Sequence, residues 1–290
     1  MTEDALADRF QDHRRQLLGV AYRMLGSLSE AEDAVQEAWI RLSRAPRGEI
    51  ENLEAWLRTV VARLCLDALR QRRARREETL DAHVPDPVVT GPGADPQEEV
   101  LLGEAVGLGL QRVLDELPPV ERVAFVLHDV FALPFEDIAP IVERTPAAAR
   151  QLASRGRRRV QGLPLPERDP VRQQAVVDEL IVATRAGDLG AVVRLLAPDV
   201  VLRLDGGPGN SRRVAGAPEV AALAVREGGF RALAASAEPA RVNGGAGLVF
   251  APGGRPHAIV GFTVAGGRVC EIDVLGDPVR LPALWARLAR

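Results

Sequence analysis

A short segment near the middle of the chain combines residue types that read nucleic-acid bases. Residues 144–160, "RTPAAARQLASRGRRRV", contain six arginines and no acidic residue. Helical spacing gathers apolar and small residues on one side of this segment and polar residues on the other. The polar side carries Arg150, Gln151, Ser154, Arg155 and Arg158. Arginine bonds bidentately to guanine, glutamine to adenine, and serine to either base. This pattern predicts a recognition helix for the major groove of DNA.

Two helices joined by a tight turn must position these residues. Residues 135–142 are expected to form the first helix, with Ile138 and Val142 facing inward. Thr145 has the properties of a helix N-cap. Pro146 falls at the first helical position, where its missing N–H costs nothing. The segment therefore predicts a helix-turn-helix.

A second basic segment lies upstream. Residues 58–76 contain seven arginines and one acidic residue, whereas residues 77–143 contain two arginines and fifteen acidic residues. Two basic segments separated by an acidic one indicate two contacts with a single polyanion, and solvated helix faces are the alternative. The upstream segment ends a helical stretch that is apolar nearly all round in its middle and should be buried.

The stretch "AEDAVQEAWIRL", residues 31–42, predicts an amphipathic helix. Its expected start is a capping box of Ser29 with Glu32. Its inward stripe consists of Ala31, Val35, Ala38 and Leu42. A second face, available to a protein partner, carries Asp33, Gln36, Glu37 and Ile40.

The C-terminal part contains residue types suited to general acid–base chemistry, namely Asp205, His257, Glu271 and Asp273. Such chemistry needs a carboxylate with a suitable pKa and an oxyanion donor. Asp205 precedes two glycines, which is typical of a turn, and His257 is expected at the surface or in a strand. We therefore expect a cavity that senses a ligand, and not an enzyme.

Segments rich in proline and glycine divide the chain into domains. Linkers without regular elements are expected at 78–103 and 163–169, and they separate residues 1–77, 104–162 and 170–290. The first two domains are expected to be all-α. The third starts with two helical segments and continues with strand-like runs between glycine-rich turns. This order predicts an α+β domain with a curved sheet packed on helices.

Composition narrows the function classes. The 290 residues are 47% hydrophobic and 27% charged, with a formal net charge of −3. No apolar run is long enough for a membrane span and no signal peptide is recognisable, so we expect a cytoplasmic protein. Cys65 and Cys270 are expected to be free thiols. No metal site or cofactor is predicted. All 37 basic residues are arginine.

Together these segments resemble the bacterial sigma factors of the extracytoplasmic-function (ECF) group, over about residues 1–162. Residues 31–42 are similar to region 2.2, which docks on the β′ clamp of RNA polymerase. Residues 54–77 resemble regions 2.3 and 2.4, which open and read the −10 promoter element. Residues 117–160 resemble region 4, which binds the −35 element. The resemblance implies a region 2 helical bundle, a region 4 helix-turn-helix, and RNA polymerase core (β′ clamp and β flap) and promoter DNA as partners.

The resemblance also implies roles for individual residues. The polymerase-binding residues would be Asp33, Gln36, Glu37 and Ile40. The −10 residues would be Asn52, Trp56, Arg58, Arg63, Arg70 and Arg73. The −35 residues would be Arg150, Gln151, Ser154, Arg155 and Arg158. Aromatic side chains stabilise unstacked bases, and this region offers only Trp39 and Trp56, of which Trp39 is expected to pack or to contact the clamp.

Residues 170–290 resemble a SnoaL-like domain, an NTF2-like cone-shaped α+β barrel. One sigma subgroup carries this domain together with three motifs, of WLPEP, DGGGK and NPDKL type. The first is weakened here to "HVPDP" at 83–87, the second keeps only "DGG" at 205–207, and the third survives as "GDPVRL" at 276–281. The residues concerned are Pro85, Asp86, Pro87, Asp205, Gly206, Gly207, Asp277 and Pro278. Arg212 and Arg213 are the candidates to replace the missing lysine. The resemblance implies that this domain regulates the sigma part in cis. Our hypothesis is that it does so by packing on the 83–87 linker, which fixes the spacing of the two DNA-binding domains. A small-molecule ligand of this domain is a possible partner.

Two other functions fit part of these patterns. A ligand-responsive helix-turn-helix repressor would bind duplex operators without polymerase, usually as a dimer. It gives no reason for the acidic–polar face of residues 31–42. A SnoaL-type isomerase or cyclase fused to a DNA-binding domain would use the acid–base candidates. A sigma factor regulated by its own C-terminal domain accounts for more of the sequence.

Overall fold

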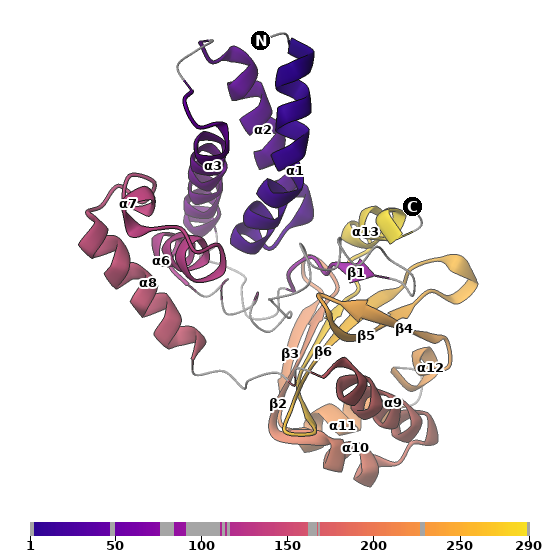
Figure 1. Cartoon of the computed structure of the whole chain (residues 1–290). Coiled ribbons are helices and arrows are strands. Elements are labelled where there is room, and N and C mark those ends of the chain that lie inside the picture. Colours follow the sequence, from indigo (N-terminus) through magenta and orange to yellow (C-terminus); the bar gives the residue numbers. More distant parts are fainter. Residues whose placement is uncertain are drawn as a thin grey trace. The chain divides into compact units, whose positions relative to one another are not determined.

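A computed structural model shows two compact units (Figure 1). The helical unit comprises residues 1–78 and 111–163, and the sheet unit comprises residues 79–110 and 164–290. The structure describes residues 3–46, 50–75, 84–90, 111, 114, 117–161, 167, 169–226 and 230–288. Within these residues, no helix is both long and apolar enough to cross a membrane.

The helical unit consists of two packed groups of helices. Its elements are α1 (Glu3–Leu25), α2 (Leu28–Arg44), α3 (Leu53–Arg75), α6 (Pro119–Phe125), the π-helix η1 (Val126–Val130), α7 (Phe135–Ile138) and α8 (Pro146–Val160). Helices α1, α2 and α3 pack on one another, and α8 packs on α6 and α7. The predicted burial of the middle of α3 is confirmed, since Leu57, Val61 and Leu66 are buried.

The predicted inward stripe of α2 is also confirmed, but its predicted start is wrong. Ala31, Val35, Ala38 and Leu42 are all buried. The N-cap is Ser27, whose side chain accepts a hydrogen bond from the Glu30 amide at 3.4 Å. The helix starts two residues before the predicted position, because Leu28 is itself buried and belongs to the apolar face.

The helix-turn-helix forms as expected, except that its first helix is short. Helix α7 ends at Ile138, although the turn that follows still buries Ile141 and Val142. Thr145 caps α8 by accepting from the Ala148 amide at 3.3 Å, and Pro146 takes the first helical position. A Cβ at Gly156 would lie 3.0 Å from the Phe125 Cβ, so α8 approaches α6 closely at this glycine. The same contacts fix which face of α8 remains exposed.

Among its described residues, the sheet unit has seven strands in the order β1-β4-β5-β6-β7-β2-β3. The strands are β1 (Val89–Thr90), β2 (Leu196–Asp205), β3 (Ser211–Ala215), β4 (Ala237–Val242), β5 (Gly245–Phe250), β6 (Ala258–Ala265) and β7 (Arg268–Leu275). Neighbours are antiparallel except for the parallel pair β2–β7. The helices are α9 (Pro170–Ala186), α10 (Leu189–Leu195), α11 (Ala217–Val225), α12 (Phe230–Ala234), α13 (Arg280–Leu288) and the 3-10 turn η2 (Pro252–Gly254). The predicted order of helical domains followed by a sheet domain is confirmed.

One strand contradicts the expected linker. Residues 89–90 of the proline-rich segment form β1, which pairs antiparallel with β4 in the register Val89↔Val242. The rest of the predicted 78–103 linker, including His83, lies outside the described residues apart from residues 84–88. We call residues 84–90 the strap. The strap belongs to the sheet unit, although it lies in sequence between the two halves of the helical unit.

The two faces of the sheet have different roles. Alternate strand residues such as Leu202, Leu248 and Ile272 form one apolar core with residues of α9, α10 and α11. Figure 1 shows these helices gathered on one side of the sheet. The opposite face carries Arg203 and Asp273, both buried, in alternation with the core residues. This second face therefore contains charges that must be paired within the protein.

Candidate functional site

The outer face of α2 is free of the helical core. Asp33 and Gln36 are exposed, while Glu37 and Ile40 are partly exposed. Glu37 accepts a hydrogen bond from Arg41 Nε at 3.0 Å, a pair on the surface of the helix. All four residues lie away from the buried stripe, as predicted, so they form an acidic–polar face that a protein partner can reach. Trp39 instead packs on Phe10 of α1 with ring centroids 5.1 Å apart.

The start of α3 brings Asn52 and Trp56 within one helical turn. Asn52 is exposed and caps α3, its side chain accepting from the Ala55 amide at 3.0 Å. Trp56 is partly exposed, so its ring is only partly used in core packing. The cap already occupies the Asn52 side-chain oxygen. The side-chain amide nitrogen of Asn52 therefore remains available to donate a hydrogen bond to a base.

The arginines along α3 are mostly engaged within the helical unit. Arg58 pairs with Glu54 at 3.1 Å, and Arg63 Nη2 donates to the Pro140 carbonyl at 3.3 Å. Arg70 lies 3.5 Å from Asp67 and 3.8 Å from Glu143. Arg73 is exposed. Arg63 and Arg70 thus contact the turn that precedes α8, and nucleic acid would have to displace both contacts.

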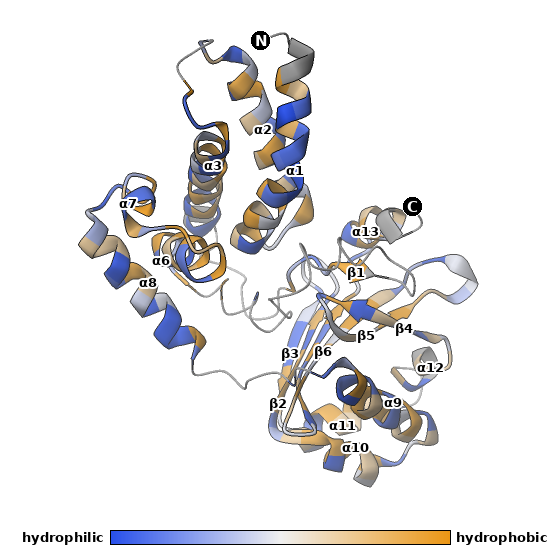
Figure 2. Cartoon of the chain, in the orientation of Figure 1, coloured by the Kyte–Doolittle hydropathy of each residue, from blue (hydrophilic) through white to orange (hydrophobic). Residues whose placement is uncertain are grey.

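The polar face of α8 is exposed as the sequence predicts. Arg150, Gln151, Arg155 and Arg158 are exposed and Ser154 is partly exposed. Figure 2 shows hydrophilic residues prevailing toward the C-terminal end of α8. The Arg150 guanidinium lies 5.1 Å from the centroid of the Phe135 ring, a cation–π contact between α8 and α7.

A buried acid that the sequence analysis missed holds two arginines of α8. Glu121 of α6 is 6% exposed. It accepts from Arg155 Nε at 2.7 Å and from Arg159 Nη1 at 2.6 Å. Arg155 is therefore fixed by an ion pair, whereas Arg150, Gln151 and Arg158 reach solvent. Glu121 sits four residues after Leu117 in an acidic stretch, and no local pattern distinguishes it from its neighbours.

The strap lies buried on the sheet unit. Residues 84–88, including Pro85 and Pro87, are all buried. The Val84 amide donates to Asp205 Oδ2 at 2.9 Å. The Val88 amide donates to Asn243 Oδ1 at 2.6 Å, and Val88 accepts from the Asn243 amide at 2.7 Å. Specific hydrogen bonds, and not only apolar contact, therefore hold the strap.

Arg280 joins residues of the three subgroup motifs in one charged cluster. Its guanidinium donates to Asp86 Oδ1 from Nε at 2.9 Å and from Nη2 at 2.6 Å, and to Asp205 Oδ2 from Nη1 at 2.8 Å. Nη2 also donates to the Val84 carbonyl at 2.7 Å. Asp277 Oδ1 accepts from the Val279 amide at 2.7 Å and so starts the turn that carries Arg280. We call Arg280, Asp86 and Asp205 the strap clamp.

The glycines after Asp205 are required by this geometry. Gly207 has φ +88°, and a Cβ there would lie 3.1 Å from the Asp277 carboxyl carbon. The Gly207 amide and the Ser211 hydroxyl both donate to Asp205 Oδ1, at 3.2 and 3.1 Å. Pro278 is exposed beside the clamp. The "DGG" turn therefore orients Asp205 toward the strap.

The clamp arginine was missed by the sequence analysis. Arg212 and Arg213, the candidates to replace the lysine, are exposed on β3. Arg280 stands within the third motif, "GDPVRL", and is its one basic residue. A search of all three motifs for a basic residue would have found it.

The acid–base candidates of the C-terminal domain do not converge. Asp205 belongs to the strap clamp, and His257 is exposed. Arg203 Nη1 lies 3.1 Å from Asp273 and Nη2 lies 3.3 Å from Glu271. Burial works to lower the pKa of Arg203, but Asp273 and Glu271 outweigh it, so the pKa lies above its ordinary value. These groups form ion pairs on the second face of the sheet, and none of the four candidates lines the apolar cavity on the first face.

Comparison with known proteins gives matches over nearly the whole chain. Residues 9–75 match the family described as Sigma-70 region 2, and residues 108–160 match Sigma-70, region 4. The chain is 41% identical to the ECF RNA polymerase sigma factor SigJ of Mycobacterium tuberculosis, covering 93% of this chain and 91% of SigJ. It is 34% identical to the probable ECF RNA polymerase sigma factor SigI of the same species, with 98% of each covered. The crystal structure of SigJ superposes with a TM-score of 0.76 and 37% identity over 95% of this chain and 98% of SigJ.

Proposed function

The chain belongs to the ECF sigma factors, and from this premise we propose that its C-terminal domain controls promoter recognition in cis. A sigma factor directs RNA polymerase core to promoters. The exposed acidic–polar face of α2 supports docking on the β′ clamp through Asp33, Gln36, Glu37 and Ile40. The whole-chain similarity to SigJ and SigI supports a role that includes the sheet unit and not only the helices.

Promoter contacts are assigned from exposure and residue type. Arg150 and Gln151 are the residues of α8 best placed to read bases of the −35 element, and Arg158 to contact phosphate. Asn52 and Trp56 are placed at the −10 element, with Arg58 and Arg73 nearby on α3. Four arginines join the DNA interface only when their present partners release them, namely Arg58, Arg63, Arg70 and Arg155.

The observation that carries the regulatory proposal is the strap clamp. The strap lies between residues 9–75 and 108–160, the two segments that match sigma regions 2 and 4. The strap is thus part of the chain segment that connects the two DNA-binding regions. When Arg280 holds the strap on the sheet unit, this part of the segment is fixed. A docked strap and a free strap allow different separations of these regions, and promoters require one separation.

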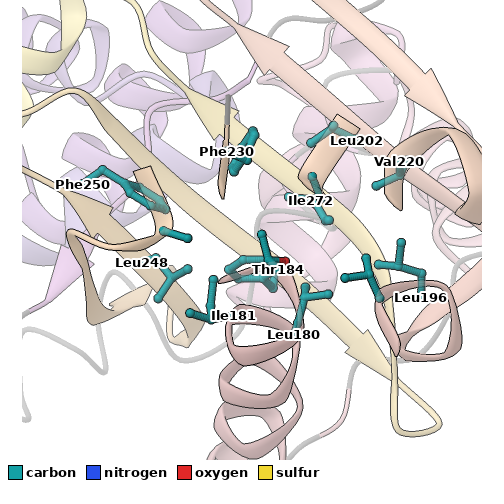
Figure 3. A pocket seen from close by; sticks show the side chains of 14 residues that line it. Leu180, Ile181, Thr184, Leu196, Leu202, Val220, Phe230, Leu248, Phe250 and Ile272 are labelled. Atoms are coloured by element: carbon teal, nitrogen blue, oxygen red, sulfur yellow. The ribbon is translucent and has the colours of Figure 1, made fainter. Parts of the chain in front are cut away.

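We also propose that the sheet unit has a SnoaL-like cone fold and that it does not catalyse a reaction. A mixed sheet with helices α9, α10 and α11 on one face encloses an apolar cavity (Figure 3). None of the lining residues that the structure describes has an acidic, basic or amide side chain. Acid–base chemistry has no proton carrier there.

Run-off transcription with core polymerase tests the proposal. The full-length chain, a truncation to residues 1–169 and full-length Arg280→Met are compared on one promoter, with Arg268→Met, an exposed arginine, as matched control. The truncation and Arg280→Met should change the yield in the same direction, while Arg268→Met should behave as wild type. Equal yields from all four proteins would contradict control by the strap. Tight duplex binding without polymerase and no run-off product would favour a repressor.

A further inference from the structure

The phenyl ring of Phe135, at the start of α7, contacts side chains of two other elements of the helical unit. The ring of His128, from η1, stacks on it with centroids 4.0 Å apart and an interplanar angle of 29°. The guanidinium of Arg150, from α8, lies 5.1 Å from the same phenyl centroid. Phe135 is itself only 9% exposed. A buried ring therefore joins η1 to an arginine on the exposed polar face of α8, and we call these three side chains the arginine stack.

The turn between η1 and α7 holds the His128 ring in place. His128 Nδ1 lies 2.9 Å from the Leu133 carbonyl oxygen, and a carbonyl oxygen only accepts, so Nδ1 is the donor. The Leu133 amide in turn donates to the Leu127 carbonyl at 2.9 Å. Ala132 reverses the chain with φ +53°, a conformation that persists in a residue with a Cβ only where the surroundings enforce it. The backbone of this turn therefore determines where the His128 ring lies.

The neighbouring residue of η1 holds α8 at a second point. Asp129 Oδ1 accepts from Arg157 Nε at 2.7 Å, and the Asp129 side chain is 19% exposed. Arg157 follows Arg150 by seven residues, which is about two turns, so both start from the same side of α8. Two consecutive residues of η1 therefore hold this side of α8, His128 through the ring of Phe135 and Asp129 through an ion pair.

Arg150 differs in this respect from the other polar residues of α8. Gln151 and Arg158 make no side-chain hydrogen bond, ion pair or ring contact with any other residue that the structure describes. Arg155 is held, but Glu121 takes up its Nε donor. An aromatic ring instead attracts the guanidinium charge and takes up none of its N–H donors. A long side chain also loses rotamer freedom when it binds, and a contact that holds it beforehand reduces this cost.

We propose that Phe135 and His128 are positioning residues for base reading by Arg150. The stack holds the Arg150 guanidinium at the surface of α8 before DNA arrives and leaves its donors available to a base. Phe135 makes the contact, and His128 acts through Phe135. This inference deepens the proposed function and rests on the assignment of Arg150 to a base of the −35 element. It adds two residues outside α8 to those that determine promoter choice.

Competition binding to single-base variants of a −35 element tests the stack, with the full-length chain assembled on core polymerase. Arg150→Ala identifies the base pair that Arg150 reads, because preference falls at that position and not at others. Phe135→Leu keeps an apolar side chain but removes the ring. It should lower preference at the same base pair about two- to fivefold, the size of an exposed cation–π contact. Phe135→Tyr keeps the ring and should behave as wild type. Adding Phe135→Leu to Arg150→Ala should change the preference no further.

The outcomes separate the stack from the base assignment on which it rests. Wild-type preference in folded Phe135→Leu, or an equal loss of affinity for every −35 variant, would overturn the stack and leave Arg150 as a base reader. A further loss of preference in the double variant would also overturn the stack. If Arg150→Ala changes preference at no single base pair, the assignment of Arg150 to a base is wrong, and the stack proposal fails with it.

A second pair of variants keeps the test decisive if Phe135→Leu does not fold. His128→Asn keeps a side-chain N–H for the Leu133 carbonyl but has no ring, whereas His128→Phe keeps a ring and loses the N–H. His128 is only partly buried, so both variants should fold. His128→Asn should lower preference at the Arg150 base pair, and His128→Phe should retain more of it. Wild-type preference in His128→Asn, or equal preference in the two variants, would overturn the proposal.

Discussion

Replacing Arg280 by methionine should release the strap from the sheet unit while the sheet stays folded. Arg280 donates to two carboxylates, Asp86 and Asp205, whose side chains are 10% and 5% exposed. Methionine keeps much of the apolar stem of arginine but offers no hydrogen bond donor. In the Arg280→Met variant, docking of the strap would bury the carboxylates of Asp86 and Asp205 without the cation that pairs with them.

The size of the effect follows from that burial. Leaving one charge of a buried pair uncompensated costs about 3–5 kcal/mol. The Arg280 side chain is itself 21% exposed, so water already screens part of the interaction. Asp205 also keeps its hydrogen bonds from Gly207 and Ser211. We therefore expect the lower end, about 3 kcal/mol, which shifts the docking equilibrium roughly 100-fold.

Hydrogen exchange of the strap amides measures this shift directly. The Val84 and Val88 amides are bonded to the sheet unit only when the strap is docked. Exchange of residues 84–90 should accelerate roughly 100-fold, while β6 keeps its protection. Arg280→Lys should give an intermediate rate, because lysine keeps the charge but loses the planar fork of donors. Arg268→Met is the matched control. Strap exchange within threefold of wild type in Arg280→Met would refute the clamp and leave the β1–β4 pairing as the anchor.

Other predictions concern the helical unit. Charge reversal at Asp33 or Glu37 should weaken capture by core polymerase with an unchanged circular dichroism spectrum, and wild-type capture would count against the docking face. Arg150→Ala should alter preference at one −35 base by about 1–3 kcal/mol in competition binding, whereas an equal loss on every sequence would make it a phosphate contact. Glu121→Gln should lower the free energy of unfolding of the helical unit in urea by about 1 kcal/mol, because the two arginines it holds on α8 are 45% and 52% exposed. Burial raises the pKa of Cys65 to about 12, so at pH 8 its thiol should resist maleimide, and fast labelling would mean that α1 to α3 open readily.

Local signals were sufficient for the elements that depend on their own residues. Helix α8 was predicted correctly because its cap at Thr145, its Pro146 and its apolar stripe all lie within seventeen residues. The start of α2 was placed two residues late because Ser27 and Ser29 each have a glutamate three residues on. Burial of Leu28 decides between them, and burial depends on α1 and α3.

Long-range pairing could not be derived in the same way. The strand β1 lies in a proline-rich segment, and its partner Val242 is about 150 residues further along. No local preference favours a strand there, and the hydrogen bonds of Val88 come from a turn in another part of the chain. The parallel pairing of β2 with β7 likewise joins segments separated by most of the sheet unit.

The strap clamp shows why a charged contact suits a segment that must dock and release. Asp86, Asp205 and Arg280 each stand in a turn-like motif that has no evident chemistry alone, and they become a site only when the fold brings them together. Docked, each charge is paired, so removing any one partner is costly. When the whole strap leaves, Asp86 leaves with it and water can reach Arg280 and Asp205. Hydration of these charges then offsets much of the free energy lost with the ion pairs. The release of the strap also exposes the apolar side chains of Val84 and Val88, and a strap held by apolar contacts alone would expose more hydrophobic surface. The charged clamp therefore adds specificity to docking and limits the hydrophobic surface of the free state.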